Sequence, residues 1–192
     1  AVGAHAQFRD GQTFDYDVSK PMIFISSTNL GNCNGCEWIA AEGTFTEDTP
    51  DVFQAFLKAQ SINHTAIIHF NSPGGNLVGA LKVGEIIRQR KFHTGVGKTR
   101  GEIAVPERGT PYVKDLTVGP GGEGVCASAC VYAFFAGSTR YAVRTRIGIH
   151  QFYDADTVRD PLAKTANAFA RSSDQLLYGI LLEYTVRMGV DP

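Results

Sequence analysis

Ser128 is the residue of this chain whose surroundings most favour covalent chemistry. It lies in the stretch Gly124–Cys130, where small side chains surround its hydroxyl just as an apolar run predicts a buried helix. The first turn of a helix offers unpaired N–H groups and a partial positive charge, and both stabilise the oxyanion formed when a hydroxyl attacks a carbonyl. Because a serine at a helix start is more often an ordinary N-cap, Ser128 predicts catalysis only together with partners.

Two further positions supply what a nucleophilic serine requires. His150 ends a short apolar strand, and its imidazole can accept the proton of a serine hydroxyl within hydrogen-bond reach. Gly74 and Gly75 follow another predicted strand, and glycine permits a tight turn that points a backbone N–H into a cleft. Taken singly, the histidine is more often structural and the glycine pair is a turn signal. The prediction of a site therefore rests on their combination.

The elements that must position these residues alternate between strands and helices. A strand, a glycine turn, a helix and a second strand follow one another over residues 65–97, which is the crossover unit of a parallel sheet. The pattern predicts an α/β fold. Strands are predicted at Met22–Ser26, Trp38–Phe45, Thr65–Phe70, Phe92–Gly97, Arg140–Val143 and Arg146–Gln151, and helices at Asp48–Ala59, Leu77–Arg88, Cys126–Gly137 and Ala163–Met188.

Length and composition predict a single domain. At 192 residues the chain can bury one sizeable core. Residues 1–19 are polar and lack a period, so we expect a loose terminus or an edge element before a domain over 20–192. Residues 99–124, rich in Pro, Gly and charge, interrupt the alternation and predict an insertion or flap beside the site.

Charge and hydropathy exclude several classes of partner. The 18 basic and 19 acidic residues give a formal net charge of −1, which argues against nucleic acid as a partner. The apolar stretches are far shorter than the roughly 18 residues of a membrane span, and no charged, apolar leader opens the chain. We expect no cofactor and no metal.

Four cysteines form two close pairs, Cys33 with Cys36 and Cys126 with Cys130. Disulfides are the favoured interpretation, and free thiols or a zinc site remain open. A bridge between Cys126 and Cys130 would span one turn of the predicted helix. Disulfides form in oxidising compartments, so we expect a periplasmic or secreted protein whose signal peptide has been removed.

The order and spacing of these motifs resemble the proteolytic subunit of the Clp protease. The resemblance runs from about Ile67 to Gln151 and into the long helix that follows, with the insertion interrupting it. The cysteines make the chain more similar to exported, periplasmic Clp-protease-like proteins of bacteria. The matching motifs are Asn71–Gly75, Ala127–Ser128, Ala136–Gly137 with Arg140, and Gly148–Gln151.

The resemblance implies a Clp-protease/crotonase-like ββα superhelix in which Ser128 is the nucleophile and His150 the general base. It also implies that Gly75 and Ala129 donate the N–H groups of the oxyanion hole. The family's third member, an aspartate after the long helix, has no match before the chain stops at Pro192. The orienting acid is therefore unknown, with Asp154, Asp156, Asp174 and Asp191 as candidates.

The predicted function is a serine peptidase or related amide/ester hydrolase that acts on a peptide or unfolded polypeptide. The alternative is a non-catalytic peptide-binding or assembly module on the same fold. A crotonase-type acyl-thioester enzyme ranks third, since it would not require this serine and histidine. Lys164 is a less favoured base than His150, because a lysine must be desolvated to lose its proton near neutral pH. Assembly into homo-oligomers is also expected from the resemblance.

Overall fold

The computed structural model describes residues 8–28, 37–62, 65–114, 123–149 and 168–191. The chain divides into two compact units, residues 1–148 and residues 149–192. Within the described residues, the first unit holds the two sheets and the helices that cover the main one, and the second holds one long helix.

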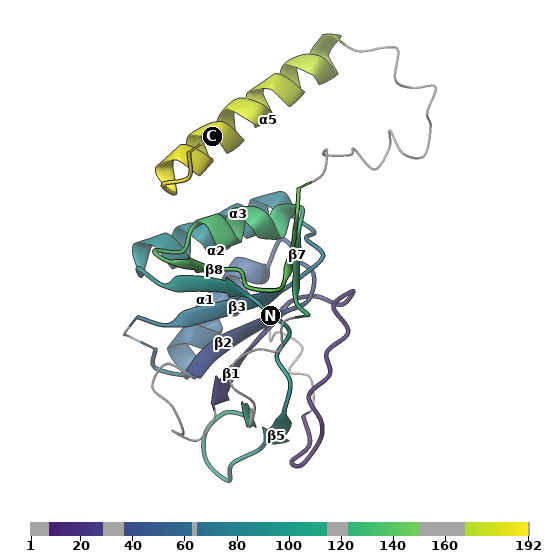
Figure 1. The fold of residues 1–192 in the computed structure, drawn as a ribbon, viewed down its shortest axis with the longest axis vertical. Helices are drawn as coiled ribbons and strands as arrows, with labels where there is room; N and C mark the ends of the chain where they lie inside the picture. The colour runs from purple at the N-terminus through teal and green to yellow at the C-terminus, as the bar shows by residue number, and fades with distance from the viewer. Residues whose placement is uncertain (1–7, 29–36, 63–64, 115–122, 150–167, 192) are drawn as a thin grey trace. The chain divides into compact units, whose positions relative to one another are not determined.

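A mostly parallel sheet forms the centre of the first unit (Figure 1). Neighbours pair in parallel except β1 with β2 and β5 with β6, which are antiparallel. The mixed α/β class predicted from the sequence is confirmed. Within the described residues the strand order is β5-β6-β1-β2-β3-β4-β8, with β1 at Ile23–Thr28, β2 at Glu37–Glu42, β3 at Ile67–Asn71, β4 at His93–Val96, β5 at Glu102–Ala104, β6 at Tyr112–Lys114 and β8 at Arg140–Tyr141.

In the described part of the chain, three helices pack on one face of this sheet: α1 (Thr49–Ala59), α2 (Leu77–Gln89) and α3 (Ala129–Phe135). The ring of Phe24 on β1 stacks on Phe53 of α1 at 4.5 Å between centroids. The Thr94 hydroxyl on β4 donates to the Phe134 carbonyl of α3 at 2.7 Å. Helix α2 starts at Asn76, whose side-chain oxygen accepts from the Gly79 N–H at 2.7 Å, and it lies beside α3 (Figure 1).

The opposite face of the sheet is covered by the N-terminal segment. Phe14 is buried there against Trp38, Ile103 and Val113. The segment also extends the sheet edge, because the Phe14 N–H donates to the Gly101 carbonyl at 2.9 Å and the Ile103 N–H donates to the Gln12 carbonyl at 2.8 Å. Residues 11–14 therefore lie along β5.

Two predicted elements differ from the structure. The predicted insertion over 99–124 contains β5 and β6, which join the main sheet beside β1, while residues 115–122 lie outside the described residues. The helix predicted from Cys126 begins only at Ala129, because β7 (Val125–Ala127) pairs in parallel with β9 (Arg146–Gly148). Partners distant in sequence decide these short strands, and a run of small residues does not reveal them.

The second unit contains helix α5 (Ala168–Arg187), within the predicted range Ala163–Met188. None of the helices in the described parts of the chain is both long and apolar enough to cross a bilayer. Apolar side chains are exposed along α5 from position 176 onward: Leu176, Tyr178, Ile180, Leu182 and Val186.

Candidate active site

Ser128 forms a sharp turn between strand β7 and helix α3. Its backbone has φ 55° and ψ −126°, a conformation that a residue with a side chain rarely adopts. The Ser128 N–H donates to the Gly148 carbonyl of β9 at 2.8 Å, and the Ser128 carbonyl accepts from the Val131 N–H at 3.1 Å. α/β-hydrolases hold their serine nucleophile at the end of a strand on a strained strand-to-helix turn.

A disulfide closes around this turn. Cys126 on β7 and Cys130 on α3 are bonded, with Cα atoms 5.3 Å apart, and both residues are fully buried. The bridge therefore joins a strand to a helix, rather than spanning one helical turn as the sequence predicted. The other predicted pair, Cys33 and Cys36, lies outside the described residues.

The Gly74–Gly75 turn lies directly against Ser128. Both glycines have positive φ, 111° and 121°, and the turn is held by the Phe45 N–H, which donates to the Gly74 carbonyl at 2.8 Å. A Cβ atom at position 74 would lie 2.7 Å from the Ser128 Cβ and 3.2 Å from the Ala129 nitrogen. Only glycine permits so close an approach.

Two backbone donors beside Ser128 remain unengaged. Neither the Gly75 N–H nor the Ala129 N–H donates a hydrogen bond to any residue that the structure describes. A buried N–H without an acceptor costs free energy unless a ligand or water satisfies it, and Ala129 is 1% exposed. The structure thus brings together three of the predicted site residues, Ser128, Ala129 and the glycine turn.

The predicted base lies outside the described residues. His150 follows β9 by two positions in the chain, and the described residues stop at Ile149. The candidate acids Asp154 and Asp156, and Lys164, fall in the same undescribed range, 150–167. Of the two remaining acids, Asp191 is exposed, and the side chain of Asp174 is not described.

Sequence reasoning missed Glu42, a buried carboxyl group near the site. Glu42 is 1% exposed at the end of β2. Burial raises the pKa of Glu42 to about 7, against the lowering effect of hydrogen bonds from Thr99 and Asn71. One signal was available in the sequence, because Glu42 is a charged residue directly after the apolar run 38–41.

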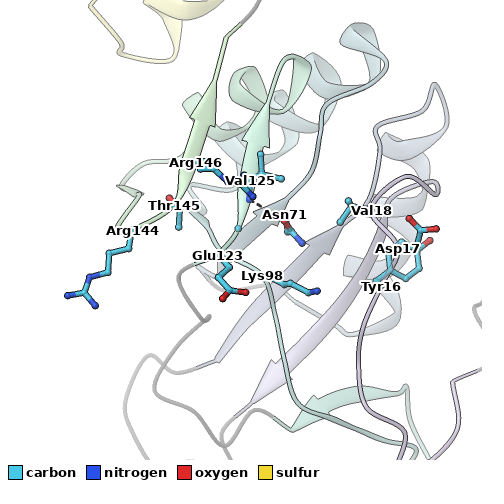
Figure 2. Close-up of a pocket in the computed structure, with 11 residues that line it drawn as sticks. Tyr16, Asp17, Val18, Asn71, Lys98, Glu123, Val125, Arg144, Thr145 and Arg146 are labelled. Atoms are coloured by element: carbon cyan, nitrogen blue, oxygen red, sulfur yellow. Dashed lines mark hydrogen bonds between the residues drawn. The ribbon is translucent and has the colours of Figure 1, made fainter.

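A pocket of about 680 Å³ opens at the other end of β7 (Figure 2). Val125, the first residue of β7, lines it, whereas Ser128 and the glycine turn do not. Its charged lining residues carry both signs, and Arg144 points away from the rest in Figure 2. The lining includes Tyr16, Asp17, Asn71, Lys98, Glu123, Arg144 and Arg146. No group of three or more metal-binding side chains gathers in the described parts of the chain.

A scan against protein-family models finds no family that matches this chain, and a search of curated proteins finds no similar sequence. The interpretation of the site therefore depends on its own geometry.

Proposed function

We propose that the protein is a serine hydrolase that cleaves peptide or related amide and ester bonds, with Ser128 as nucleophile. The observation that carries the proposal is the strained turn at Ser128, which lies against the Gly74–Gly75 turn with the Gly75 and Ala129 N–H groups unengaged among the described residues. A nucleophile and two donors around one substrate carbonyl are the arrangement that acyl transfer requires.

In the proposed reaction the Ser128 Oγ attacks the carbonyl carbon while His150 accepts the hydroxyl proton. The carbonyl oxygen becomes an oxyanion that the Gly75 and Ala129 N–H groups stabilise. The C–N or C–O bond then breaks, and the leaving group takes the proton from the imidazolium. Water, deprotonated by the same imidazole, hydrolyses the acyl-serine and restores the free hydroxyl.

The course of the chain supports His150 in this role. His150 is two positions after Gly148 in the sequence, and Gly148 on β9 pairs with Ala127 and accepts the Ser128 N–H. We propose that the first unit adopts the Clp-protease-like superhelix, and that the disulfide reflects folding in an oxidising compartment, as for an exported protein.

Covalent labelling tests the proposal. The protein is treated with a fluorophosphonate probe, and intact mass is measured for the parent, Ser128→Ala and His150→Ala. We expect one adduct on the parent, none on Ser128→Ala and slower labelling without His150. Ser138→Ala is the matched control, because Ser138 is an exposed serine at the other end of α3, and its labelling should equal that of the parent.

Absence of an adduct on the folded parent would contradict the hydrolase. Specific peptide binding that survives Ser128→Ala would then favour the non-catalytic module.

A further inference from the structure

A buried hydrogen-bonded cluster joins the ends of two strands next to the proposed site. Glu42 and Asn71 are the last residues of β2 and β3 and are register partners in the parallel pair. Asn71 donates through its Nδ2 to Glu42 Oε2 at 2.6 Å, and the Thr99 N–H donates to Glu42 Oε1 at 2.7 Å. Each carboxylate oxygen therefore holds one donor, in a place where Glu42 is 1% and Asn71 5% exposed.

The cluster continues directly into the strand that carries the nucleophile. The Asn71 Oδ1 accepts from the Val125 N–H at 3.1 Å, the bond drawn in Figure 2. The next residue extends the ladder, because the Ser72 N–H donates to the Val125 carbonyl at 2.7 Å and the Ser72 carbonyl accepts from the Ala127 N–H at 3.1 Å. β7 contains three residues and Ser128 follows it, so this ladder sets the place from which the nucleophile turn departs.

We propose that Glu42 is a positioning residue for Ser128. By accepting from Asn71, Glu42 fixes the orientation of the Asn71 amide, and the amide oxygen in turn fixes the start of β7. The inference rests on the proposed hydrolase, in which misplacement of the nucleophile by a fraction of an ångström slows the reaction.

Only one arrangement of donors and acceptors satisfies every hydrogen bond of the cluster. Above the raised pKa of about 7 the Glu42 carboxylate is ionised and only accepts, so it satisfies both the Asn71 amide and the Thr99 N–H, and the comparison of variants is made in that pH range. A glutamine at position 42 would turn its own NH2 group toward one of these donors. If the Asn71 amide reversed to avoid this, its NH2 group would face the Val125 N–H instead. An isosteric Glu42→Gln exchange therefore breaks one hydrogen bond wherever the amides turn.

Exchanging both residues restores every donor–acceptor pair, and this makes the inference testable. In the double variant Glu42→Gln with Asn71→Asp, the amide introduced at position 42 donates to the carboxylate at position 71 and accepts from Thr99, and that carboxylate accepts from Val125. The single exchange Asn71→Asp instead places two carboxyl groups against each other. The double variant has the same atoms and charge at this site as the parent, with the donor and acceptor roles reversed.

The experiment measures the fluorophosphonate labelling rate per folded molecule in the parent, both single variants and the double variant. We expect labelling about 10- to 100-fold slower in each single variant and within about threefold of the parent in the double variant. Glu107→Gln, at an exposed glutamate, is the matched control and should label as the parent does. Folded single variants that label at the parent rate, or a double variant still about tenfold slow, would overturn the inference.

Amide exchange at Val125 is read in parallel, since it reports the cluster without catalysis. We expect slow exchange of this N–H and of the Thr99 N–H in the parent and the double variant, and faster exchange of one of the two in Glu42→Gln, where one of them loses its acceptor. In Asn71→Asp the carboxylate still accepts from Val125, so its N–H should exchange slowly there too. A parent that the probe leaves unlabelled contradicts the proposed function, and with it the positioning role, even if the exchange pattern holds. If a single variant does not fold, the double variant is the test. A double variant that folds and labels as the parent does supports the inference, and one that does not overturns it.

Discussion

The two faces of the main sheet bury different kinds of side chain. The helix-covered face is apolar, with Phe53 and Phe70 fully buried, and its buried Thr94 hydroxyl is satisfied by the Phe134 carbonyl. The opposite face mixes an apolar cluster with ionisable groups. There, in the described part of the chain, Glu42 is buried and the Nδ1 atoms of His69 and His93 are buried without a hydrogen-bond partner.

The apolar face and the face with ionisable groups should therefore differ in how their contributions to stability depend on pH. Apolar packing depends little on pH, whereas a buried carboxyl or imidazole couples folding to protons. The helix face should therefore dominate the stability of the first unit at every pH, and the opposite face should determine how that stability changes with pH.

Truncation of the helix-face core should have the largest effect. Phe53 is 0% exposed and stacks on Phe24, so Phe53→Ala is expected to lower the free energy of unfolding by about 3–5 kcal/mol. Urea unfolding followed by circular dichroism measures it. Phe56→Ala is the matched control on the same helix, because Phe56 is only partly buried and its ring lies 6.1 Å from Phe24. Equal losses in the two variants would contradict the special role of the buried stack.

Two groups on the opposite face should give opposite pH dependences. Glu42 has its pKa raised from 4.5 to about 7 by burial, so the free energy of unfolding falls as pH rises through this window. His69 has its pKa lowered from 6.5 to about 4 by burial, so the same free energy falls as pH drops through that window. Each slope reaches about 1.4 kcal/mol per pH unit, or about 3 kcal/mol over the window.

Because these windows overlap and the two slopes have opposite signs, the contributions of Glu42 and His69 to the parent's free energy of unfolding should nearly cancel between pH 4.5 and 6.5. Variants separate the two contributions. Glu42→Gln leaves only the His69 contribution, so it should become more stable as pH rises, and His69→Phe leaves only the Glu42 contribution, so it should become less stable. Urea titrations at several pH values measure both. The charged groups near Glu42 are Lys98 and Asp15, which form an ion pair at 2.7 Å, so Asp15→Asn is the control for their contribution. Parallel pH curves for parent and variants would contradict the assignment.

The elements of the helix-covered face were predicted well from the sequence. Apolar side chains at helical spacing gave α1 and α2 nearly to the residue, and Asn71–Gly75 placed a turn after β3. Such patterns are local, so one sequence window contains the whole signal.

The rest depended on contacts that no window contains. β7 is a strand because Ser72 and β9 pair with it, so the residues before Ser128 were wrongly predicted as helix. The small neighbours of Ser128 made its hydroxyl a candidate nucleophile, but they did not predict its strained turn. The partners of Glu42 come from positions 71 and 99, and a strand pattern cannot show that they converge on one carboxylate.

The smallest expected effect concerns the covalent link on the helix side of the site. The Cys126–Cys130 bridge closes a loop of only a few residues, so the double variant Cys126→Ala with Cys130→Ala should lose about 2 kcal/mol of stability. Thermal unfolding measures this, and a Tm lower by about 4–8 °C is expected. The substitutions are preferable to a reductant, which would also act on any bond at Cys33 and Cys36.

The same variant tests whether packing alone holds the strained turn. Ser128 keeps its positive φ at a cost that the surrounding contacts must offset, and the bridge fixes the residues two positions before and after it. Labelling at Ser128 should therefore slow even at temperatures where the variant is fully folded. Unchanged labelling with lowered Tm would assign the bridge to stability alone and leave the Gly74 contact and the Glu42 cluster to hold the nucleophile.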